Sequence, residues 1–426
     1  MDAVTVAGIG FGPSNLALAV ALAEAVNTPA DLDWAFFERQ QRFGWHRGML
    51  IDGATMQVSF LKDLVSMRNP TSRYSFVSYL HAHGRLTEFI NSKTTFPSRV
   101  EFHDYLEWAA RDFTGQVSYD TQVVDVRPVS EGGRIACVDV VARVKSTGET
   151  VVRRARNIVV GTGLVSRLPE GVTLSDRVRH SCSLLNHGTD LADSDPRRLV
   201  VVGAGQSAAE VAEYLHRVCP RAEICIVLSR FGYSVADDNP FANAIFAPET
   251  VGLFHTARDG VKQMLLNYHA NSNYSVVDLE LTEELYRRYY QELVTGKPRL
   301  RVMNTSRVRE VTEVADGVHL DVEFLPTGEV RPLLADAVVF ATGYRPSNPL
   351  SLLGGIAAEC KRDAADRLLL DRDHRVVTSE ALTAGIFVHG PAAEPSHGLS
   401  SGLLSTTAVR AGEIADSILG GNRRRT

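Results

Sequence analysis

The sequence contains few cysteines and no long hydrophobic run. Its five cysteines form neither a Cys-x-x-Cys pair nor a cluster with histidine, so we predict no disulfide framework, no redox dithiol and no metal site. No apolar run approaches the ~18 residues that a membrane-spanning helix needs, and no signal-peptide pattern precedes the first apolar segment. We therefore expect a cytoplasmic protein that does not enter a membrane.

The chain also lacks an excess of basic residues. Its 45 lysines and arginines are outnumbered by 50 aspartates and glutamates, for a net charge of -5, which argues against nucleic-acid binding. The 44% of hydrophobic and 22% of charged residues are typical of a globular protein. Because 426 residues exceed one ordinary core, we expect two or three domains.

Residues 4–25 have the pattern of an apolar strand, a glycine-rich turn and an amphipathic helix. Gly8 permits a tight turn at the strand end, and Gly10 lets backbone N–H groups approach a pyrophosphate at the helix N-terminus. Pro13 replaces the usual third glycine and suits the first helical position, where its missing N–H has no intrahelical partner. We predict that this turn, in which Gly12 lies between Gly10 and Pro13, binds a dinucleotide. The alternative is an ordinary strand-to-helix turn without a ligand.

A carboxylate ends the second apolar strand, predicted over residues 34–38. Glu38 follows Gly8 by 38 − 8 = 30 positions, somewhat more than the usual ~20. We predict that its carboxylate binds ribose hydroxyls of the dinucleotide.

The plan of the first half recurs in the second half. Two β-rich runs within residues 134–160 predict a hairpin that leads to Gly-Thr-Gly at 161–163. A second strand and glycine turn, residues 199–208, precede a hairpin at 308–330 that leads to Ala-Thr-Gly at 341–343. Because chance would have to supply this order twice, the repetition predicts two dinucleotides, a flavin in the first half and a nicotinamide in the second.

The strand after the second glycine turn ends in Ser229 and Arg230 rather than in an acidic residue. An arginine there can pair with a ribose 2′-phosphate, which a carboxylate would repel. Arg230 therefore favours NADPH over NADH.

The segment at residues 56–70 is unusual because charged and amide side chains interrupt its apolar residues. One interpretation is a partly buried, irregular stretch that keeps the charge of Lys62 in solvent. The other interpretation places Gln57 and Lys62 in a cleft. Between Arg230 and Arg299, asparagines lie beside aromatics, which fits either a small-molecule site or ordinary capping and turns.

Four further helices are suggested by the pattern of apolar residues. They are predicted over residues 72–80, 102–110 and 281–294, with a last helix that begins at His397. Tyr105 and Trp108, in the helix predicted over residues 102–110, are candidates for the hydrophobic core of the protein.

Eight segments together match one enzyme family: GIGFGPSNLALA, WHRGM, MQVSFLKDLVSMRNP, GAGQSAAE, NPFANAIF, NSNYSVVD, FATGY and HGLSSGLLS. The chain resembles, essentially from end to end, the flavin-dependent N-hydroxylating monooxygenases of siderophore biosynthesis, especially the bacterial L-ornithine hydroxylases. The resemblance implies an α/β fold with two Rossmann-like dinucleotide-binding domains and a small, mainly helical, substrate-binding insertion. It implies an FAD-binding domain at 1–165 completed by 340–426, an NADPH-binding domain at 166–235 and 296–339, and the insertion at 236–295.

The resemblance also implies which residues form the site. Beyond the first glycine turn, those expected to contact FAD are Glu38 to His46, including Trp45, together with Gln57, Val123, His397, Gly398 and Leu399. Those expected to contact NADPH are Ala204, Gly205, Gln206, Ser207, Arg230, Asn273, Tyr274 and Ser275. Those expected to bind the substrate are Lys62, Asn243, Phe246, Asn273 and Ser400, and the catalytic set is Gln57, Lys62 and Asn273. Ser401 departs from the family, in which many members place aspartate.

The implied activity uses FAD, NADPH and O₂ to convert the side-chain amine of L-ornithine into a hydroxylamine through a flavin hydroperoxide, for siderophores or other hydroxamate products. L-lysine or a diamine is the alternative substrate. Lys62 is better suited to bind the substrate carboxylate than to act as a base, because an unbranched amino acid needs one end held while the other reaches the flavin. The resemblance also implies a homo-oligomer.

Three other functions share parts of this pattern. A disulfide reductase with two dinucleotides would need the absent Cys-x-x-Cys pair. A ketone-oxidising flavin monooxygenase usually carries F-x-G-x-x-x-H-x-x-x-W, whereas the run around His180 has Leu174, Asp176 and Leu184 at the other marked positions. A non-catalytic flavoprotein that senses NADPH or oxygen would retain the same glycine turns.

Overall fold

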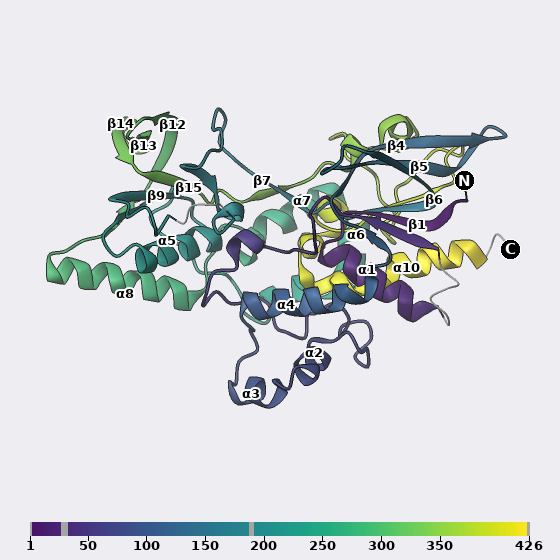
Figure 1. Cartoon of the computed structure of the whole chain (residues 1–426), viewed down its shortest axis with the longest axis horizontal. Helices are drawn as coiled ribbons and strands as arrows, with labels where there is room; N and C mark the ends of the chain where they lie inside the picture. The colour runs from purple at the N-terminus through teal and green to yellow at the C-terminus, as the bar shows by residue number, and fades with distance from the viewer. Residues whose placement is uncertain (1, 27–32, 187–190, 424–426) are drawn as a thin grey trace.

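The computed structural model describes residues 2–26, 33–186 and 191–423, and its two halves are each built on a β-sheet. The first sheet lies on the right of Figure 1 and the second on the left. The first sheet has the order β3-β2-β1-β6-β5-β4, and β17 also pairs with β6. Its strands are β1 (Val4–Ile9), β2 (Trp34–Phe37), β3 (Val117–Ser118), β4 (Thr121–Glu131), β5 (Arg134–Val144), β6 (Thr150–Val160) and β17 (Gly385–Val388).

The centre of the first sheet is β1, which runs parallel to both β2 and β6. Gly8 lies opposite Phe36 on one side and Val159 on the other. All of β1 is buried, as expected for an interior parallel strand. The antiparallel pairing of β5 with β6 confirms the hairpin predicted within residues 134–160.

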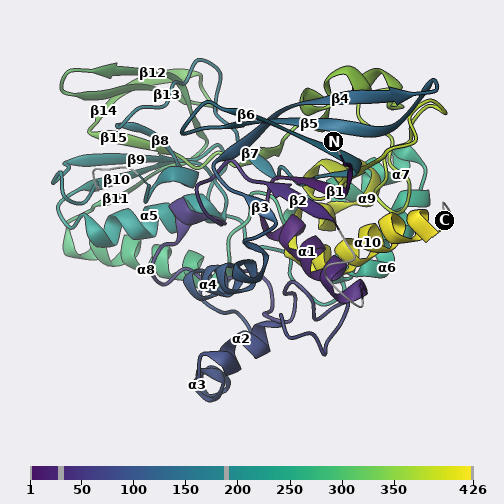
Figure 2. The ribbon, with the colours of Figure 1, turned by 45° about the vertical axis from the view of Figure 1, so that its right-hand side comes forward.

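The helix after the first glycine turn, α1 (Pro13–Ala25), is buried on all sides rather than amphipathic. Every residue from Asn15 to Leu22 is buried. The prediction of an amphipathic helix was wrong because the C-terminal helix α10 (Thr407–Arg423) packs on α1. Figure 2 shows the two helices side by side beneath the first sheet.

The second sheet is entirely parallel, in the order β11-β10-β9-β15-β8. Its strands are β8 (Val178–His180), β9 (Arg198–Val202), β10 (Glu223–Val227), β11 (Leu300–Met303) and β15 (Ala337–Phe340). On one face lie α5 (Gln206–Val218) and α8 (Leu279–Thr295), which contact each other. On the other face lies the antiparallel sheet of β12 (Ser306–Val314), β13 (Gly317–Phe324) and β14 (Glu329–Ala335), which confirms the second hairpin. Figure 1 shows this three-layer arrangement.

The chain passes between the two halves through a small antiparallel ribbon. It leaves the first half along β7 (Leu164–Ser166) and returns along β16 (Tyr344–Pro346), which pair with each other. These strands directly follow the Gly-Thr-Gly and Ala-Thr-Gly segments that mark the repeat. The repeat seen in the sequence is therefore a repeat in the structure, with one main sheet and one closing segment in each half.

The remaining helices lie in three segments, between β2 and β3, between β10 and β11, and after β17. They are α2 (Phe76–Ala82), α3 (Leu86–Asn91), α4 (Arg99–Ala110), α6 (Pro248–Thr256), α7 (Asp259–Tyr268) and α9 (Glu394–His397). In Figures 1 and 2, α2 and α3 project away from the rest of the molecule. Tyr105 on α4 is fully buried, as predicted, whereas Trp108 is only partly buried. Among the described residues, no helix is both long and apolar enough to cross a membrane.

Two helices begin four or more residues later than predicted. The helix predicted from residue 72 begins at Phe76, because Ser75 is its N-cap and accepts a 3.1 Å hydrogen bond from the N–H of Ser78. The last helix begins at Thr407 rather than at His397. Gly398, with φ +87°, interrupts the helical path, and short turns occupy the intervening segment.

Candidate active site

Both glycine turns end at helix N-termini that carry no side-chain cap. Gly12 is the N-cap of α1, and Gly205 is the N-cap of α5; neither helix has an acidic residue in its first turn. Space is open beside Gly12, where an added Cβ would meet nothing within 4 Å. Because the first N–H groups of a helix lack intrahelical partners and carry a partial positive charge, both turns fit the phosphates of a dinucleotide.

In each half, a turn glycine packs against the segment that closes the repeat. Gly10 has φ +83°, and a Cβ there would lie 2.7 Å from the carbonyl oxygen of Gly161. Gly203 has φ +150°, and a Cβ there would lie 2.3 Å from the carbonyl oxygen of Ala341. Side chains at these two positions would therefore separate each turn from its closing segment.

The Glu38 carboxylate lies at the first glycine turn, as its predicted role requires. It is buried, and it accepts hydrogen bonds from the N–H groups of Phe11 at 2.7 Å and Gln40 at 2.9 Å. Each carboxylate oxygen can accept a second hydrogen bond. Glu38 thus remains able to accept from ribose hydroxyls.

The other residues predicted to contact FAD differ in exposure. Trp45 packs on the core of the first half, and its ring lies edge-on to the ring of His46, whose φ is +52°. Val123 is buried in the core of the first half beside a break in the register of β4 and β5. The His397 side chain is also buried.

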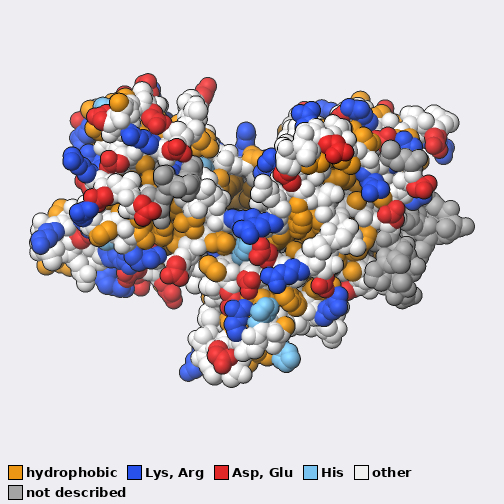
Figure 3. All heavy atoms as spheres, in the orientation of Figure 1, with side chains coloured by type: hydrophobic (Ala, Val, Ile, Leu, Met, Phe, Trp, Pro, Cys, Tyr) orange, Lys and Arg blue, Asp and Glu red, His pale blue; other side chains and the backbone are white. Residues whose placement is uncertain are grey.

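The predicted NADPH residues come together from three segments. A Cβ on Gly205 would lie 3.4 Å from the Cα of Ser275, and the guanidinium of the exposed Arg230 donates a 3.1 Å hydrogen bond to the Ser275 carbonyl. The turn containing Ala204 and Ser207 thus lies against the loop that carries Asn273. Figure 3 shows the surface hollowed between the two lobes, with hydrophobic side chains in the hollow.

Three of the predicted substrate residues lie on two turns that contact each other. The 3₁₀ turn Ala242–Phe246, which carries Asn243, contacts the 3₁₀ turn Leu399–Gly402, which carries Ser400. Asn243 is exposed, whereas Phe246 and Ser400 are buried. The Tyr274 hydroxyl donates to the Glu394 carboxylate and so connects the loop at 273–275 to the C-terminal segment.

Lys62 lies on a turn that the buried Asp63 carboxylate holds together. Asp63 accepts hydrogen bonds from the N–H groups of Val65, Ser66 and Phe76 at 2.9, 2.6 and 2.8 Å. Burial lowers the pKa of the half-buried Lys62 ammonium, and no charged group in the described part of the chain offsets that effect. The Asp63 carboxylate thus accepts its hydrogen bonds within the turn, so the Lys62 ammonium can pair with another anion.

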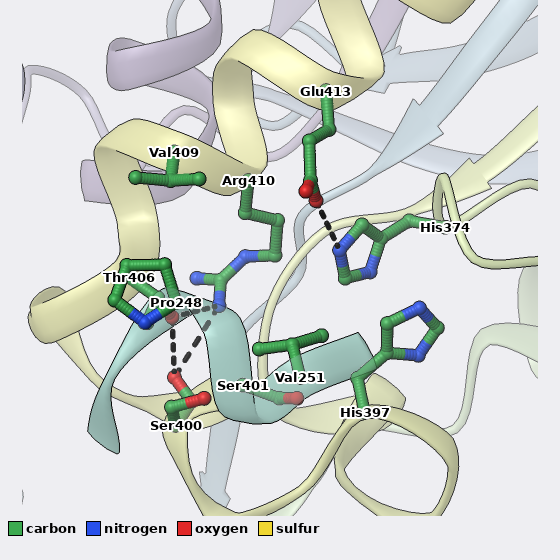
Figure 4. Close-up of a pocket in the computed structure, with 10 residues that line it drawn as sticks. All are labelled: Pro248, Val251, His374, His397, Ser400, Ser401, Thr406, Val409, Arg410 and Glu413. Carbon is green, nitrogen blue, oxygen red and sulfur yellow. Dashed lines mark hydrogen bonds and ion pairs between the residues drawn. The ribbon is translucent and has the colours of Figure 1, made fainter. Parts of the chain in front are cut away.

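The turn that carries Ser400 is held from behind by a buried arginine (Figure 4). The Ser400 carbonyl accepts from the guanidinium of Arg410 at 3.3 Å and from the hydroxyl of Thr406 at 3.2 Å. Burial lowers the pKa of Arg410 to about 10. Arg410 and Asp63 therefore position two turns on which predicted substrate residues lie.

A group of buried histidines lies beside this turn. The rings of His374 and His397 stack with their centroids 3.9 Å apart, and Glu413 lies 3.6 Å from His374. Burial lowers the pKa of His374 to about 4 and that of His397 to about 2. Both imidazoles are neutral near pH 7, so the His397 side chain is a buried structural group in this conformation.

Gln57 and Gln206, predicted to contact different cofactors, share one hydrogen-bond acceptor. Both side-chain amides donate to the same carboxylate oxygen of Asp278, at 3.3 and 2.6 Å. Sequence reasoning did not select Asp63, Arg410 or Asp278 as individual site residues. Only Asp278 carried a local signal, as an acidic N-cap before α8.

Comparison with known proteins identifies the family. Residues 2–346 match the family model for L-lysine 6-monooxygenase/L-ornithine 5-monooxygenase. The L-ornithine N(5)-monooxygenase of Burkholderia cepacia is 41% identical over 398 residues, which cover 92% of this chain and 89% of that protein. The ornithine N-hydroxylase of Kutzneria sp. 744, in a structure with reduced FAD, NADP⁺ and L-ornithine, is 45% identical, with coverage of 100% for both chains and a TM-score of 0.94.

A solved relative that is named for a different substrate is also similar. The L-lysine 6-monooxygenase of Pseudomonas syringae is 32% identical over 98% of this chain and 99% of that one, with a TM-score of 0.83. All these matches cover most or all of the chain. The chain belongs to the L-lysine 6-monooxygenase/L-ornithine 5-monooxygenase family.

Proposed function

We propose that this protein is an NADPH- and O₂-dependent flavin monooxygenase that hydroxylates the side-chain amine of L-ornithine. The observation that carries the proposal is the full-length similarity to an ornithine hydroxylase structure that contains FAD, NADP⁺ and L-ornithine. The two uncapped helix N-termini at the glycine turns support two dinucleotide sites.

FAD is assigned to the first glycine turn. The turn from Gly8 to Pro13 would hold the pyrophosphate at the start of α1, and Glu38 would accept from ribose hydroxyls. The proposed further contacts are Trp45, His46, Gln57, Val123, His397, Gly398 and Leu399. Val123 and His397 are themselves buried, at 6% and 1% exposure.

NADPH is assigned to the second glycine turn, from Ala204 to Ser207. Arg230 carries the preference for the 2′-phosphate, because it is exposed and lies beside the loop at 273–275. Its hydrogen bond to the Ser275 carbonyl uses one of five N–H donors, so the others remain available.

FAD, when bound and reduced by NADPH, would activate O₂ so that one oxygen atom is transferred to the amine and the other leaves as water. The chain has to bind the amino acid in one orientation. Lys62 would bind the α-carboxylate, while Asn243, Phe246, Asn273 and Ser400 would surround the rest of the molecule. An ammonium of this kind has a reference pKa of ~10.4, so exclusion of water by these side chains would favour the neutral, reactive amine.

Ornithine is preferred over lysine and diamines for two reasons. The ornithine hydroxylase from Kutzneria is 45% identical, whereas the lysine enzyme from Pseudomonas syringae is 32% identical. When Lys62 holds the carboxylate, the length of the substrate side chain determines where the amine lies. A misplacement of ~1 Å at the reacting atom can reduce the rate by about 100-fold. Lysine is one methylene longer, and putrescine has no carboxylate to hold.

The proposal is tested by mass spectrometry of the products. Purified protein would be incubated with FAD and NADPH in air, with ornithine, lysine or putrescine supplied separately. We expect one oxygen atom to be added to ornithine far faster than to either alternative. Comparable oxidation of lysine would reassign the substrate, and NADPH binding without product from any amine would favour the non-catalytic sensor.

The proposal extends to the pathway and the compartment in which the protein acts. A hydroxylated ornithine is a precursor suited to hydroxamate siderophores or related natural products. We place this reaction in the cytoplasm, where NADPH is supplied. The homo-oligomeric state remains a prediction from family resemblance.

A further inference from the structure

Asp278 joins three parts of the structure through hydrogen bonds. Its Oδ2 atom accepts from Nε2 of Gln206 at 2.6 Å and from Nε2 of Gln57 at 3.3 Å. Its Oδ1 atom accepts from the N–H of Leu281 at 2.8 Å and so caps α8. One carboxylate thus contacts the first half of the chain, the start of α5 and the start of its own helix.

The Gln206 amide is held in a single orientation. Its Oε1 atom accepts from the N–H of Asp278 at 2.9 Å, while its Nε2 atom donates to the Asp278 carboxylate and to Oε1 of Glu210 at 3.1 Å. A rotated amide would place its oxygen against two carboxylates and its NH₂ against an N–H donor. Asp278 therefore determines how Gln206 is presented at the turn that follows Gly205.

The Asp278 backbone is itself anchored on its N-terminal side. Val277 pairs with Val235, and its N–H donates to the Ser234 carbonyl at 2.9 Å. The Gln57 side chain is exposed, and the hydrogen bond to Asp278 is the one that its amide makes within the described residues. Asp278 is thus the fixed partner, and Gln57 the side chain that it positions.

We propose that Asp278 is a positioning residue for hydroxylation, which sets the Gln57 and Gln206 amides together across the junction of the flavin and nicotinamide sites. This inference rests on the proposed function for the identity of the two sites. Gln57 extends from the flavin-binding half and Gln206 from the nicotinamide-binding turn, so one carboxylate aligns the two halves of the site. When Asp278 is changed, NADP⁺ is held less tightly and NADPH oxidation becomes less coupled to hydroxylation.

The test uses two substitutions that separate positioning from helix capping. Both Asp278→Asn and Asp278→Ser retain an oxygen that can cap α8. Asparagine has the same shape but presents NH₂ toward the two glutamine donors, and serine is too short to reach them. Asp366→Asn is the matched control, because it makes the same chemical change at an exposed site in the first half, where the Asp366 side chain pairs, among the described residues, with Arg362 alone.

Three measurements are compared with wild type in FAD-loaded protein. We expect both variants to raise the NADP⁺ dissociation constant in calorimetry by about tenfold, as for the loss of one to two hydrogen bonds to a charged group. We also expect more H₂O₂ per hydroxylated ornithine and an unchanged midpoint of urea unfolding. Gln57→Ala combined with Asp278→Asn should release no more H₂O₂ than Asp278→Asn alone, because the two changes break the same contact.

The inference is overturned if both variants bind NADP⁺ and couple oxidation as wild type does. It is also overturned if binding weakens only in proportion to a lower unfolding midpoint, since that pattern describes a cap alone. Failure of wild type to hydroxylate any amine would instead contradict the proposed function, and the NADP⁺ binding measurement would still decide the role of Asp278.

Discussion

Arg99 and Glu210 join the two halves of the protein through a buried, bidentate ion pair. The guanidinium of Arg99 on α4 donates to both carboxylate oxygens of Glu210 on α5, at 2.8 and 2.6 Å. The two side chains are only 11% and 5% exposed. The pair lies next to Gln206, which also donates to Glu210, so a structural contact between the halves adjoins the proposed nicotinamide site.

Removal of one partner of this pair should destabilise the protein strongly. Arg99→Ala or Glu210→Ala leaves a buried charge without its partner, which costs about 3–5 kcal/mol in the free energy of unfolding. Urea denaturation of both single variants and the double variant measures the coupling.

The matched control is the exposed pair Arg331 and Glu329, whose side chains are 61% and 52% exposed. Its removal should change stability by no more than about 1 kcal/mol. Equal effects at the two pairs would show that the buried ion pair does not hold the halves together.

Arg230 should determine which nicotinamide coenzyme is used. Arg230→Ala removes a charge-assisted hydrogen bond to the 2′-phosphate, worth about 1.5–3 kcal/mol, so KM for NADPH should rise roughly ten- to hundredfold. KM for NADH should change little, since NADH has no 2′-phosphate. Steady-state kinetics with both coenzymes measure this difference, and equal losses would place Arg230 outside the phosphate site.

The buried histidines should make stability depend on pH. Burial lowers the pKa of His374 to about 4 in the folded chain, whereas an unfolded histidine titrates near ~6.5. Between these values the unfolded chain binds a proton that the folded chain does not. The contribution of His374 is therefore fully present above pH ~6.5 and is lost toward pH ~4, by up to ~1.4 kcal/mol per pH unit.

The change His374→Asn isolates this contribution. Asparagine tolerates the left-handed backbone at this position, where φ is +65°, and cannot titrate. Urea unfolding from pH 7.5 to 4.5 should show a smaller slope for the variant, by up to one proton. The variant retains the charged and titratable groups around this position, which are His389, His397, Arg372, Arg410 and Glu413. An identical slope in both proteins would contradict the assignment.

Local patterns in the sequence were sufficient for much of the fold. The glycine turns near Gly10 and Gly203, the two hairpins and the repeat depend on residues close together in the chain, and the structure confirms them. The full burial of α1 was not predictable in this way, because its covering helix α10 comes from the other end of the chain.

In the candidate site too, features that depend on local sequence were predicted, whereas contacts between residues far apart in the sequence were not. Local motifs indicated the turns at Gly12 and Gly205, and the structure confirms their geometry. The partners that hold other residues in place lie far away in the sequence: Asp278 is 278 − 57 = 221 positions from Gln57. No periodicity or spacing within one sequence reports such contacts. Family resemblance selected candidate residues, but it did not show which side chains are buried.

The role of Lys62 in substrate binding is tested most directly by the kinetics of ornithine hydroxylation by Lys62→Ala. Putrescine serves as the matched substrate without a carboxylate. If the half-buried Lys62 ammonium binds the α-carboxylate, the variant should raise KM for ornithine about ten- to hundredfold. Flavin reduction by NADPH, followed by stopped-flow absorbance, should remain nearly unchanged, and the low activity on putrescine should not fall further. Efficient putrescine hydroxylation by wild type, or equal damage to flavin reduction and ornithine KM, would contradict the carboxylate site and place Lys62 with the cofactor.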